Sequence, residues 1–232
     1  MLGIGKRIIL MDMKKNNIFD KYIDKDYKEF QDKLIPNSNI LGIRMPKLKE
    51  IAKELVKNND LSLLNCDLNY HEEKIVYMLM LSNIKDVNIV HDKLDLMVPK
   101  IDNWAVCDSL MNIKIIRKNR DYFYDLIEKY RYSKKEFEVR FVLIMLFSHY
   151  MDESYLDIIF DVIESVNTDY YYSKMGLAWL LCECFIKYRD YTLKRFNDLK
   201  IDNFSFNKAI DKIRDSYRVS DIDKSYLKSL KR

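Results

Sequence analysis

Residues 135–150 read KEFEVRFVLIMLFSHY, and this stretch decides the class of fold. It contains neither Gly nor Pro, and its apolar residues recur at three- and four-residue spacing, which is the period of an α-helix. The uninterrupted apolar run from Phe141 to Phe147 is far shorter than the roughly 20 residues that a membrane-spanning helix needs. We therefore expect a helix over 135–150 and no membrane partner.

The same spacing continues along the chain, which has only 4 Gly and 3 Pro among 232 residues. So few turn-forming residues argue against a β-sandwich, a β-barrel or a Rossmann sheet. A hydrophobic content of 48% argues against intrinsic disorder. The sequence predicts an all-α protein, with helices over 12–34, 46–57, 71–83, 87–98, 102–116, 119–131, 135–150, 153–166, 170–188, 190–199, 204–217 and 221–231.

Three residues suggest where individual helices begin. Pro46 suits a first helical turn, because backbone N–H groups in that turn have no partner within the helix and proline lacks an N–H. Asp102 and Ser220 each precede an apolar-periodic stretch, and both residue types are frequent N-caps.

The predicted helices form six pairs of about 39 residues, near the repeat length of HEAT and armadillo proteins. Such pairs stack into an α-α superhelix with a concave groove. A compact irregular bundle is the alternative. No stretch resembles a flexible linker, so we expect one HEAT-like domain over 1–232, with residues 1–12 as a loosely ordered extension.

Charge is unevenly distributed, although 40 Lys and Arg nearly balance 36 Asp and Glu. Residues 1–60, 114–140 and 187–232 are basic, whereas 61–113 and 141–186 are acidic. Basic blocks can hold a polyanion such as a nucleic acid, and similar variation also occurs on ordinary charged surfaces.

The 4 cysteines and 3 histidines show no spacing typical of a metal site, so we expect neither a metal nor a cofactor. Cysteines without a secretory signal are typical of a reduced, cytoplasmic protein. A Gly-rich phosphate loop and an HExxH motif are absent from the sequence, which leaves nucleotide hydrolysis and metalloprotease chemistry unsupported.

Two aromatic residues are each followed, four positions later, by a carboxylate. Trp104 and Asp108 share one helix face, as do Trp179 and Glu183. An indole beside a carboxylate suits a cation, or a substrate that becomes cationic as it reacts. Simple core packing is the alternative for both pairs. Gly176 lies in the second predicted helix and indicates close packing or a close ligand there.

Basic residues near predicted helix ends are candidate phosphate contacts. Arg44 and Lys47 belong to the cluster RMPKLK, and Arg218 belongs to RDSYRVS. Arg140 precedes the apolar run and suits either a phosphate or a local partner such as Glu136. Clusters of this kind also occur on surfaces that bind no phosphate.

Taken together, several segments resemble, in order and spacing, the AlkD-like family of DNA alkylation repair glycosylases. That family is built of HEAT-like helical pairs, and the resemblance spans about residues 20–230. The segments that carry it are LGIRMPKLKEIAK (41–53), DNWAVCD (102–108), FEVRF (137–141), KMGLAWLLCE (174–183) and IRDSYRVS (213–220).

The resemblance implies roles for individual residues. Asp108 matches the catalytic carboxylate, and Trp104 and Trp179 match two indoles that flank the nucleotide carrying the lesion. Arg140 matches a DNA-contacting arginine, whereas Cys182 stands where the family has a second one. We add Lys174 to the DNA contacts, Phe30 as the counterpart of an N-terminal pocket Tyr, and Glu183 as a pocket residue.

The implied activity is excision of positively charged N3- or N7-alkylated purines from duplex DNA by a monomer. Such a base leaves without protonation, and a carboxylate stabilises the positive charge that develops on the sugar. Two alternatives stay open: a non-catalytic protein that binds damaged or branched DNA, and a protein-interaction scaffold.

Overall fold

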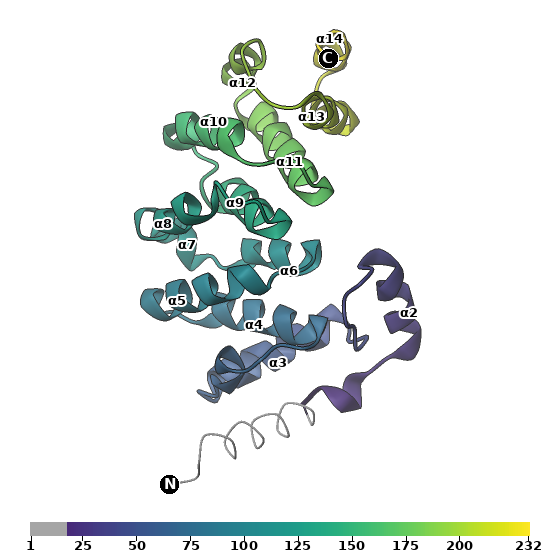
Figure 1. Ribbon diagram of the computed structural model, residues 1–232, viewed down its shortest axis with the longest axis vertical. Coiled ribbons are helices and arrows are strands. Elements are labelled where there is room, and N and C mark those ends of the chain that lie inside the picture. The colour runs from purple at the N-terminus through teal and green to yellow at the C-terminus, as the bar shows by residue number, and fades with distance from the viewer. Residues whose placement is uncertain (1–17) are drawn as a thin grey trace. The chain divides into compact units, whose positions relative to one another are not determined.

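A computed structural model describes residues 18–232, and over this range the chain forms α-helices and short 3-10 helices without a strand (Figure 1). The predicted all-α class is therefore confirmed. The described chain forms two compact units, residues 18–115 (unit 1) and 116–232 (unit 2). The single domain over 1–232 stays a prediction, and the proposed extension over 1–12 lies outside the described residues.

Unit 1 is built around helix α4, which is buried on nearly all sides. Its residues Ile75, Val76, Met78 and Met80 are all fully buried. A helix with apolar residues on all sides is stable only when other elements enclose it. Helices α3, α5 and α6 pack on α4. The elements are η1 (Asp20–Tyr22), α2 (Lys25–Leu34), α3 (Met45–Lys57), η2 (Ser62–Asn65), α4 (His71–Asn83), α5 (Val87–Met97), η3 (Val98–Lys100), α6 (Trp104–Asp108) and η4 (Ser109–Asn112).

A buried carboxylate holds the chain that leads into α3. Glu72 accepts hydrogen bonds from the backbone N–H groups of Leu41, Gly42 and Ile43, at 2.9, 2.7 and 3.2 Å. Gly42 has φ of +92°, and a Cβ there would clash with the carbonyl oxygen of Asp24. The turn therefore requires glycine at this position.

Unit 2 is built of successive pairs of helices. In Figure 1 the helices α8, α10 and α12 form one layer, and α9, α11 and α13 form the other. Helix α11 packs on both α9 and α13. After α7 (Ile115–Lys118), which crosses the boundary between the units, the elements are α8 (Arg120–Tyr130), α9 (Glu136–His149), η5 (Glu153–Tyr155), α10 (Leu156–Ser165), α11 (Tyr171–Lys187), α12 (Arg189–Phe196), α13 (Asn203–Asp215) and α14 (Asp221–Ser229).

Several hydrogen bonds between successive pairs in unit 2 join residues 34 positions apart, and others join residues 29 to 36 positions apart. Examples of the 34-residue separation are Thr168 to Asp202, and Arg189 to Asp223. The repeat is therefore shorter here than the average of about 39 residues that the sequence indicates. The helical pairs themselves are as expected, and the apolar stretch 135–150 becomes α9, whose residues 141–146 are fully buried.

Most predicted helices agree with the observed ones to within three residues, but three predicted stretches are not single α-helices. The stretch 102–116 breaks into α6, η4 and the start of α7, because Ser109 and Asn112 donate side-chain hydrogen bonds to backbone carbonyls at 2.9 and 3.0 Å. In 153–166, η5 precedes α10. In 12–34, the described part is interrupted between η1 and α2, since the backbone is extended at Ile23 and Asp24.

Of the predicted helix starts, Pro46 and Ser220 are confirmed. The Ser220 hydroxyl accepts from the N–H of Asp223 at 3.1 Å. The prediction for Asp102 was wrong, since Asn103 caps α6 and Asp102 forms an ion pair with Lys74 at 2.5 Å.

Candidate functional site

Helix α6 carries the first indole and carboxylate. Trp104 and Asp108 are its first and last residues, one helical turn apart, and both side chains are half-buried. Val106 and Cys107, between them, are fully buried and anchor the helix. The indole and the carboxylate therefore share one side of α6 and stay accessible to solvent.

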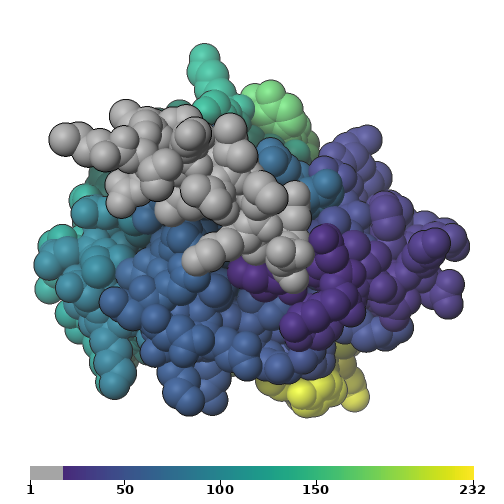
Figure 2. Space-filling view, turned by 90° about the horizontal axis from the view of Figure 1, so that it is seen from below, coloured from purple at the N-terminus to yellow at the C-terminus, as the bar shows by residue number. Residues whose placement is uncertain are grey.

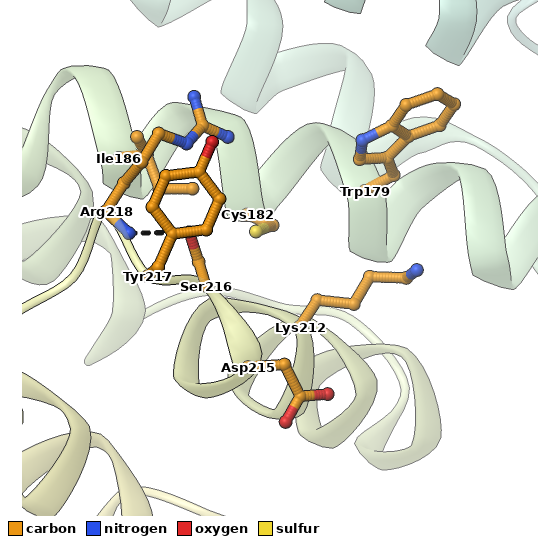
Figure 3. Close-up of a pocket in the computed structure, with 8 residues that line it drawn as sticks. All are labelled: Trp179, Cys182, Ile186, Lys212, Asp215, Ser216, Tyr217 and Arg218. Atoms are coloured by element: carbon orange, nitrogen blue, oxygen red, sulfur yellow. Dashed lines mark hydrogen bonds between the residues drawn. The ribbon is translucent and has the colours of Figure 1, made fainter.

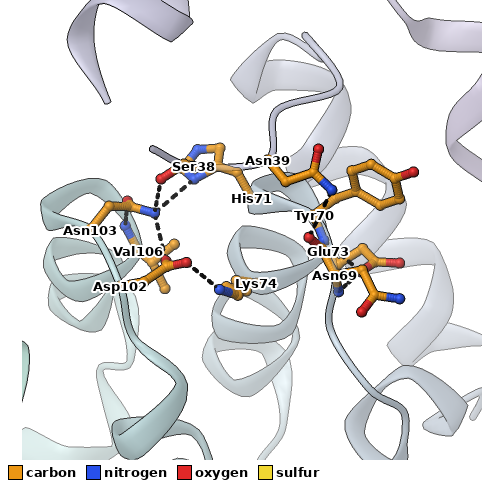
Figure 4. A network of polar contacts seen from close by, with 10 residues as sticks. All are labelled: Ser38, Asn39, Asn69, Tyr70, His71, Glu73, Lys74, Asp102, Asn103 and Val106. Atoms are coloured by element: carbon orange, nitrogen blue, oxygen red, sulfur yellow. Dashed lines mark hydrogen bonds and ion pairs between the residues drawn. The ribbon is translucent and has the colours of Figure 1, made fainter. Parts of the chain in front are cut away.

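The start of α6 is held by a network of polar contacts around Asn103 (Figure 4). The Asn103 side-chain oxygen accepts from the N–H of Val106 at 3.0 Å, and its amide nitrogen lies 3.3 Å from Oγ of Ser38 and 3.2 Å from Nδ1 of His71. Asn103 is only 3% exposed. Since this residue directly precedes Trp104, the network fixes the backbone position from which the Trp104 indole projects.

Burial of His71 lowers its imidazole pKa below the ordinary value of 6.5. Glu72 and Asp102 act in the opposite direction, and Lys74 adds to the lowering. A neutral imidazole can accept the Asn103 amide hydrogen at Nδ1. The network is therefore complete when His71 carries no charge.

The end of α2 lies beside Trp104. The indole Nε1 donates to the carbonyl oxygen of Leu34 at 3.4 Å, a contact between residues 70 positions apart. Phe30 lies one turn earlier in α2, is 54% exposed, and stacks on Tyr27 with ring centroids 6.2 Å apart. An exposed aromatic residue near Trp104 is compatible with the expected pocket role of Phe30, which stays a prediction.

Arg44 and Lys47, near the start of α3, both contact acidic side chains. Arg44 donates to Asp24 at 2.9 and 3.1 Å, and Lys47 pairs with Glu50 at 2.5 Å. The Lys47 ammonium also lies 4.6 Å from the ring centroid of Tyr22. Figure 2 shows the purple residues that precede α3 lying directly beside its blue atoms. A phosphate at either cation would compete with these acids.

A cleft of about 500 Å³ in unit 2 holds the second indole (Figure 3). In Figure 3 the side chain of Lys212 extends on the side of Trp179, whereas the Asp215 carboxylate points away. The Trp179 ring also contacts Phe147, with centroids 4.4 Å apart. The lining residues are Trp179, Cys182, Ile186, Lys212, Asp215, Ser216, Tyr217 and Arg218.

Cys182 does not supply a charge to this cleft. Burial raises the pKa of its thiol to about 11, and the neighbouring Glu183 acts in the same direction. Lys212 and Arg218 therefore provide the positive charge, and Lys212 forms no ion pair with any residue in the described range. Sequence reasoning did not single out Lys212, because a lysine on an amphipathic helix is an ordinary surface residue.

Glu183 and Arg218, both predicted site residues, contact each other. Two nitrogens of Arg218 donate to the two carboxylate oxygens, and Lys187 lies 3.9 Å from the same group. The Glu183 side chain is only 11% exposed, whereas that of Arg218 is 46% exposed. Arg218 is thus held at the mouth of the cleft with half of its surface open to solvent.

Arg140 lies where α9 and α11 approach closely. Its Nη1 donates to the carbonyl oxygen of Tyr172 at 2.9 Å, and the residue is 6% exposed. A Cβ at Gly176 would lie 3.4 Å from Leu143 and 3.5 Å from Arg140, which confirms the expected close packing. Lys174 lies 5.4 Å from the ring centroid of Phe204.

Within residues 18–232, no three His, Cys, Asp or Glu side chains gather as metal ligands would. Over the same range, none of the helices combines the length and apolar character of a membrane span.

The fold and these side chains define an all-α protein of paired helices, with an indole and a carboxylate on α6 and an indole in a basic cleft of unit 2. The chain belongs to the family of DNA alkylation repair enzymes, whose model matches residues 11–198. A comparison with curated proteins gives no match. The matched range includes Trp104, Asp108, Arg140 and Trp179, and it ends before Lys212 and Arg218.

Proposed function

We propose that this protein is a monofunctional DNA glycosylase that removes positively charged N3- or N7-alkylated purines from duplex DNA. The observation that carries the proposal is the pair Trp104 and Asp108, one turn apart on a helix whose first turn is held by Asn103. Membership in the repair family supplies the substrate class, alkylated DNA. We further propose that the protein acts as a cytoplasmic monomer.

The chemistry needs few protein groups. When the bond between the sugar carbon and the base nitrogen breaks, its electron pair neutralises the charge of the alkylated base. No acid has to protonate the base, so the base leaves directly. Positive charge develops on the sugar, where the Asp108 carboxylate stabilises it electrostatically. Water then adds to the sugar carbon and loses a proton, leaving an abasic site.

The indoles suit a cationic substrate. The face of an indole attracts a cation by about 0.5–2 kcal/mol. We assign this role to Trp104 in unit 1 and to Trp179 in unit 2. Phe30 is assigned to the pocket beside Trp104, and Glu183 to the cleft beside Trp179.

The DNA backbone would be contacted by cations of both units. In unit 1 these are Arg44 and Lys47, and in unit 2 they are Arg140, Lys174 and Arg218. Lys212 joins this set, because it lines the cleft in which the Cys182 thiol carries no charge.

The deciding experiment measures release of 3-methyladenine and 7-methylguanine from methylated duplex DNA. Asp108→Asn should lower the rate of release about 100-fold or more, the size expected when one electrostatic contact to a transition state is lost. Thermal unfolding and affinity for undamaged DNA should stay near those of the parent. Asp92→Asn is the matched control, because the Asp92 side chain is 74% exposed and lies in the same unit.

Equal release by Asp108→Asn and the parent would remove Asp108 from the mechanism. If neither protein releases a base while both bind DNA in a salt-dependent manner, the non-catalytic DNA-binding alternative is correct. If the parent binds no DNA at all, the protein-interaction scaffold is the better description.

A further inference from the structure

A second cleft, whose lining includes neither Trp104 nor Asp108, carries three lysines. It has a volume of about 350 Å³, within the range of ligand-binding pockets, and belongs entirely to unit 1. Lys49 and Lys53 enter it from α3, and Lys114 enters from the chain that follows η4. Its described lining contains no carboxylate, whereas Glu54 lines one other cleft and Asp215 lines the cleft of Figure 3.

The three lysines of this cleft lack the ion pairs that several other lysines form within the described residues. Lys49, Lys53 and Lys114 are exposed, and none forms an ion pair with a residue between 18 and 232. Lys47, on the same helix α3, is by contrast paired with Glu50. Lys49 and Lys53 are four positions apart, so their like charges repel each other across one turn. A bound anion would remove this repulsion.

The neutral polar residues of the cleft already use most of their side-chain donors. Ser82 and Asn83 donate to the carbonyl oxygen of Leu79, both at 2.7 Å, and Asn112 donates to that of Ser109 at 3.0 Å. The lysines are therefore the main donors that remain for a ligand, together with the second N–H of the Asn112 amide. Ammonium groups without a fixed fork geometry act on an anion mainly as point charges.

We propose that this cleft binds backbone phosphates of DNA at a second contact surface, distinct from α6. The described lining has no aromatic residue on which a base could stack, which argues against a free nucleotide. The C-terminal end of α4 also borders the cleft, and its partial negative charge disfavours a tightly enclosed phosphate. Mobile lysines facing a phosphodiester chain fit both features. The choice of DNA rests on the proposed function.

The test measures the affinity of the full chain for a labelled, undamaged duplex across a series of salt concentrations. In the test variant, Lys49, Lys53 and Lys114 are each changed to Gln. In the control variant, Lys25, Lys194 and Lys228 are changed to Gln, which gives the same net charge. These three lysines are also exposed, and none has an ion-pair partner in the described part of the chain.

We expect the test variant to bind about tenfold or more weakly at low salt, with a slope of log K against log salt smaller by about 2 to 3. The control variant should keep the slope of the parent, and changing the three cleft lysines to Arg should restore it. Equal slopes in the test and control variants would overturn the proposal.

Two further measurements separate the possible failures. If inorganic tripolyphosphate binds the parent but not the test variant, while DNA affinity is the same in both, the cleft takes a free phosphate and the DNA assignment is wrong. Base release from methylated DNA is measured independently with Asp108→Asn. If the protein releases no base in that assay, the salt dependence of DNA binding still tests the lysine cleft.

Discussion

The guanidinium of Arg218 donates two hydrogen bonds to the carboxylate of Glu183, at 3.2 and 2.9 Å. This pair joins α11 to the chain that follows α13, at the edge of the cleft that holds Trp179. A phosphate that contacts Arg218 would share it with Glu183. The carboxylate therefore limits how strongly this arginine can bind DNA.

Glu183→Gln tests that relationship. The variant should bind DNA more tightly than the parent, because the cleft loses a negative charge and Arg218 becomes available. The free energy of unfolding should fall by about 1 kcal/mol or less, since half of the Arg218 side chain is already in solvent. Fluorescence anisotropy and urea unfolding measure the two effects. Lower base release together with unchanged DNA affinity would instead indicate a direct role of Glu183 at the substrate.

Asn103→Ala should weaken the start of α6. Loss of the N-cap costs about 0.5–2 kcal/mol of unfolding free energy. Base release should fall further than stability explains, because Trp104 follows the cap directly. Asn103→Asp is the matched control, since a carboxylate still accepts from the N–H of Val106 while losing the donor toward His71. If Asn103→Ala releases the base at the rate of the parent, at a temperature at which the variant is fully folded, the cap does not position Trp104.

The buried imidazole of His71 predicts a pH dependence of stability. Its pKa in the fold lies below 6.5, so the unfolded chain takes up the proton first as the pH falls. The unfolding free energy should therefore decrease below about pH 6.5 and level off below the pKa in the fold. The difference between the parent and His71→Gln, followed by urea unfolding from pH 8 to pH 5, isolates this contribution. Parallel curves for the two proteins would contradict it.

Gly176 offers a test of packing between α9 and α11. An added Cβ would make van der Waals contact at 3.4 and 3.5 Å, so Gly176→Ala should raise the unfolding free energy by up to about 1 kcal/mol through helix propensity. Gly176→Val should lower it by about 1–3 kcal/mol, because the additional methyl groups meet Leu143 and Arg140. Thermal unfolding measures both. Destabilisation by Ala equal to that by Val would show that the helices tolerate no added atom.

Helix positions could be predicted well because they depend on local spacing. Long apolar-rich stretches between polar residues placed α4, α9 and α11 almost to the residue. The breaks at Asp24 and within 102–116 were missed, since each depends on a side chain that competes with helical hydrogen bonds. Asn103 and Asp102 are both frequent N-cap residues, so nothing in the local pattern shows which of them caps α6.

By itself, the sequence determined the all-α class, most of the helices and the indole–carboxylate spacing on α6, because these features repeat over one helical turn. Only the tertiary structure decided that Arg218 meets Glu183, that Asn103 meets His71, and that Lys114 joins Lys49 and Lys53 in one cleft. Each of these contacts brings together residues that are about 30 or more positions apart in the sequence, although Lys49 and Lys53 themselves lie on one helix. These contacts depend on which helices pack together, and local periodicity does not contain that information.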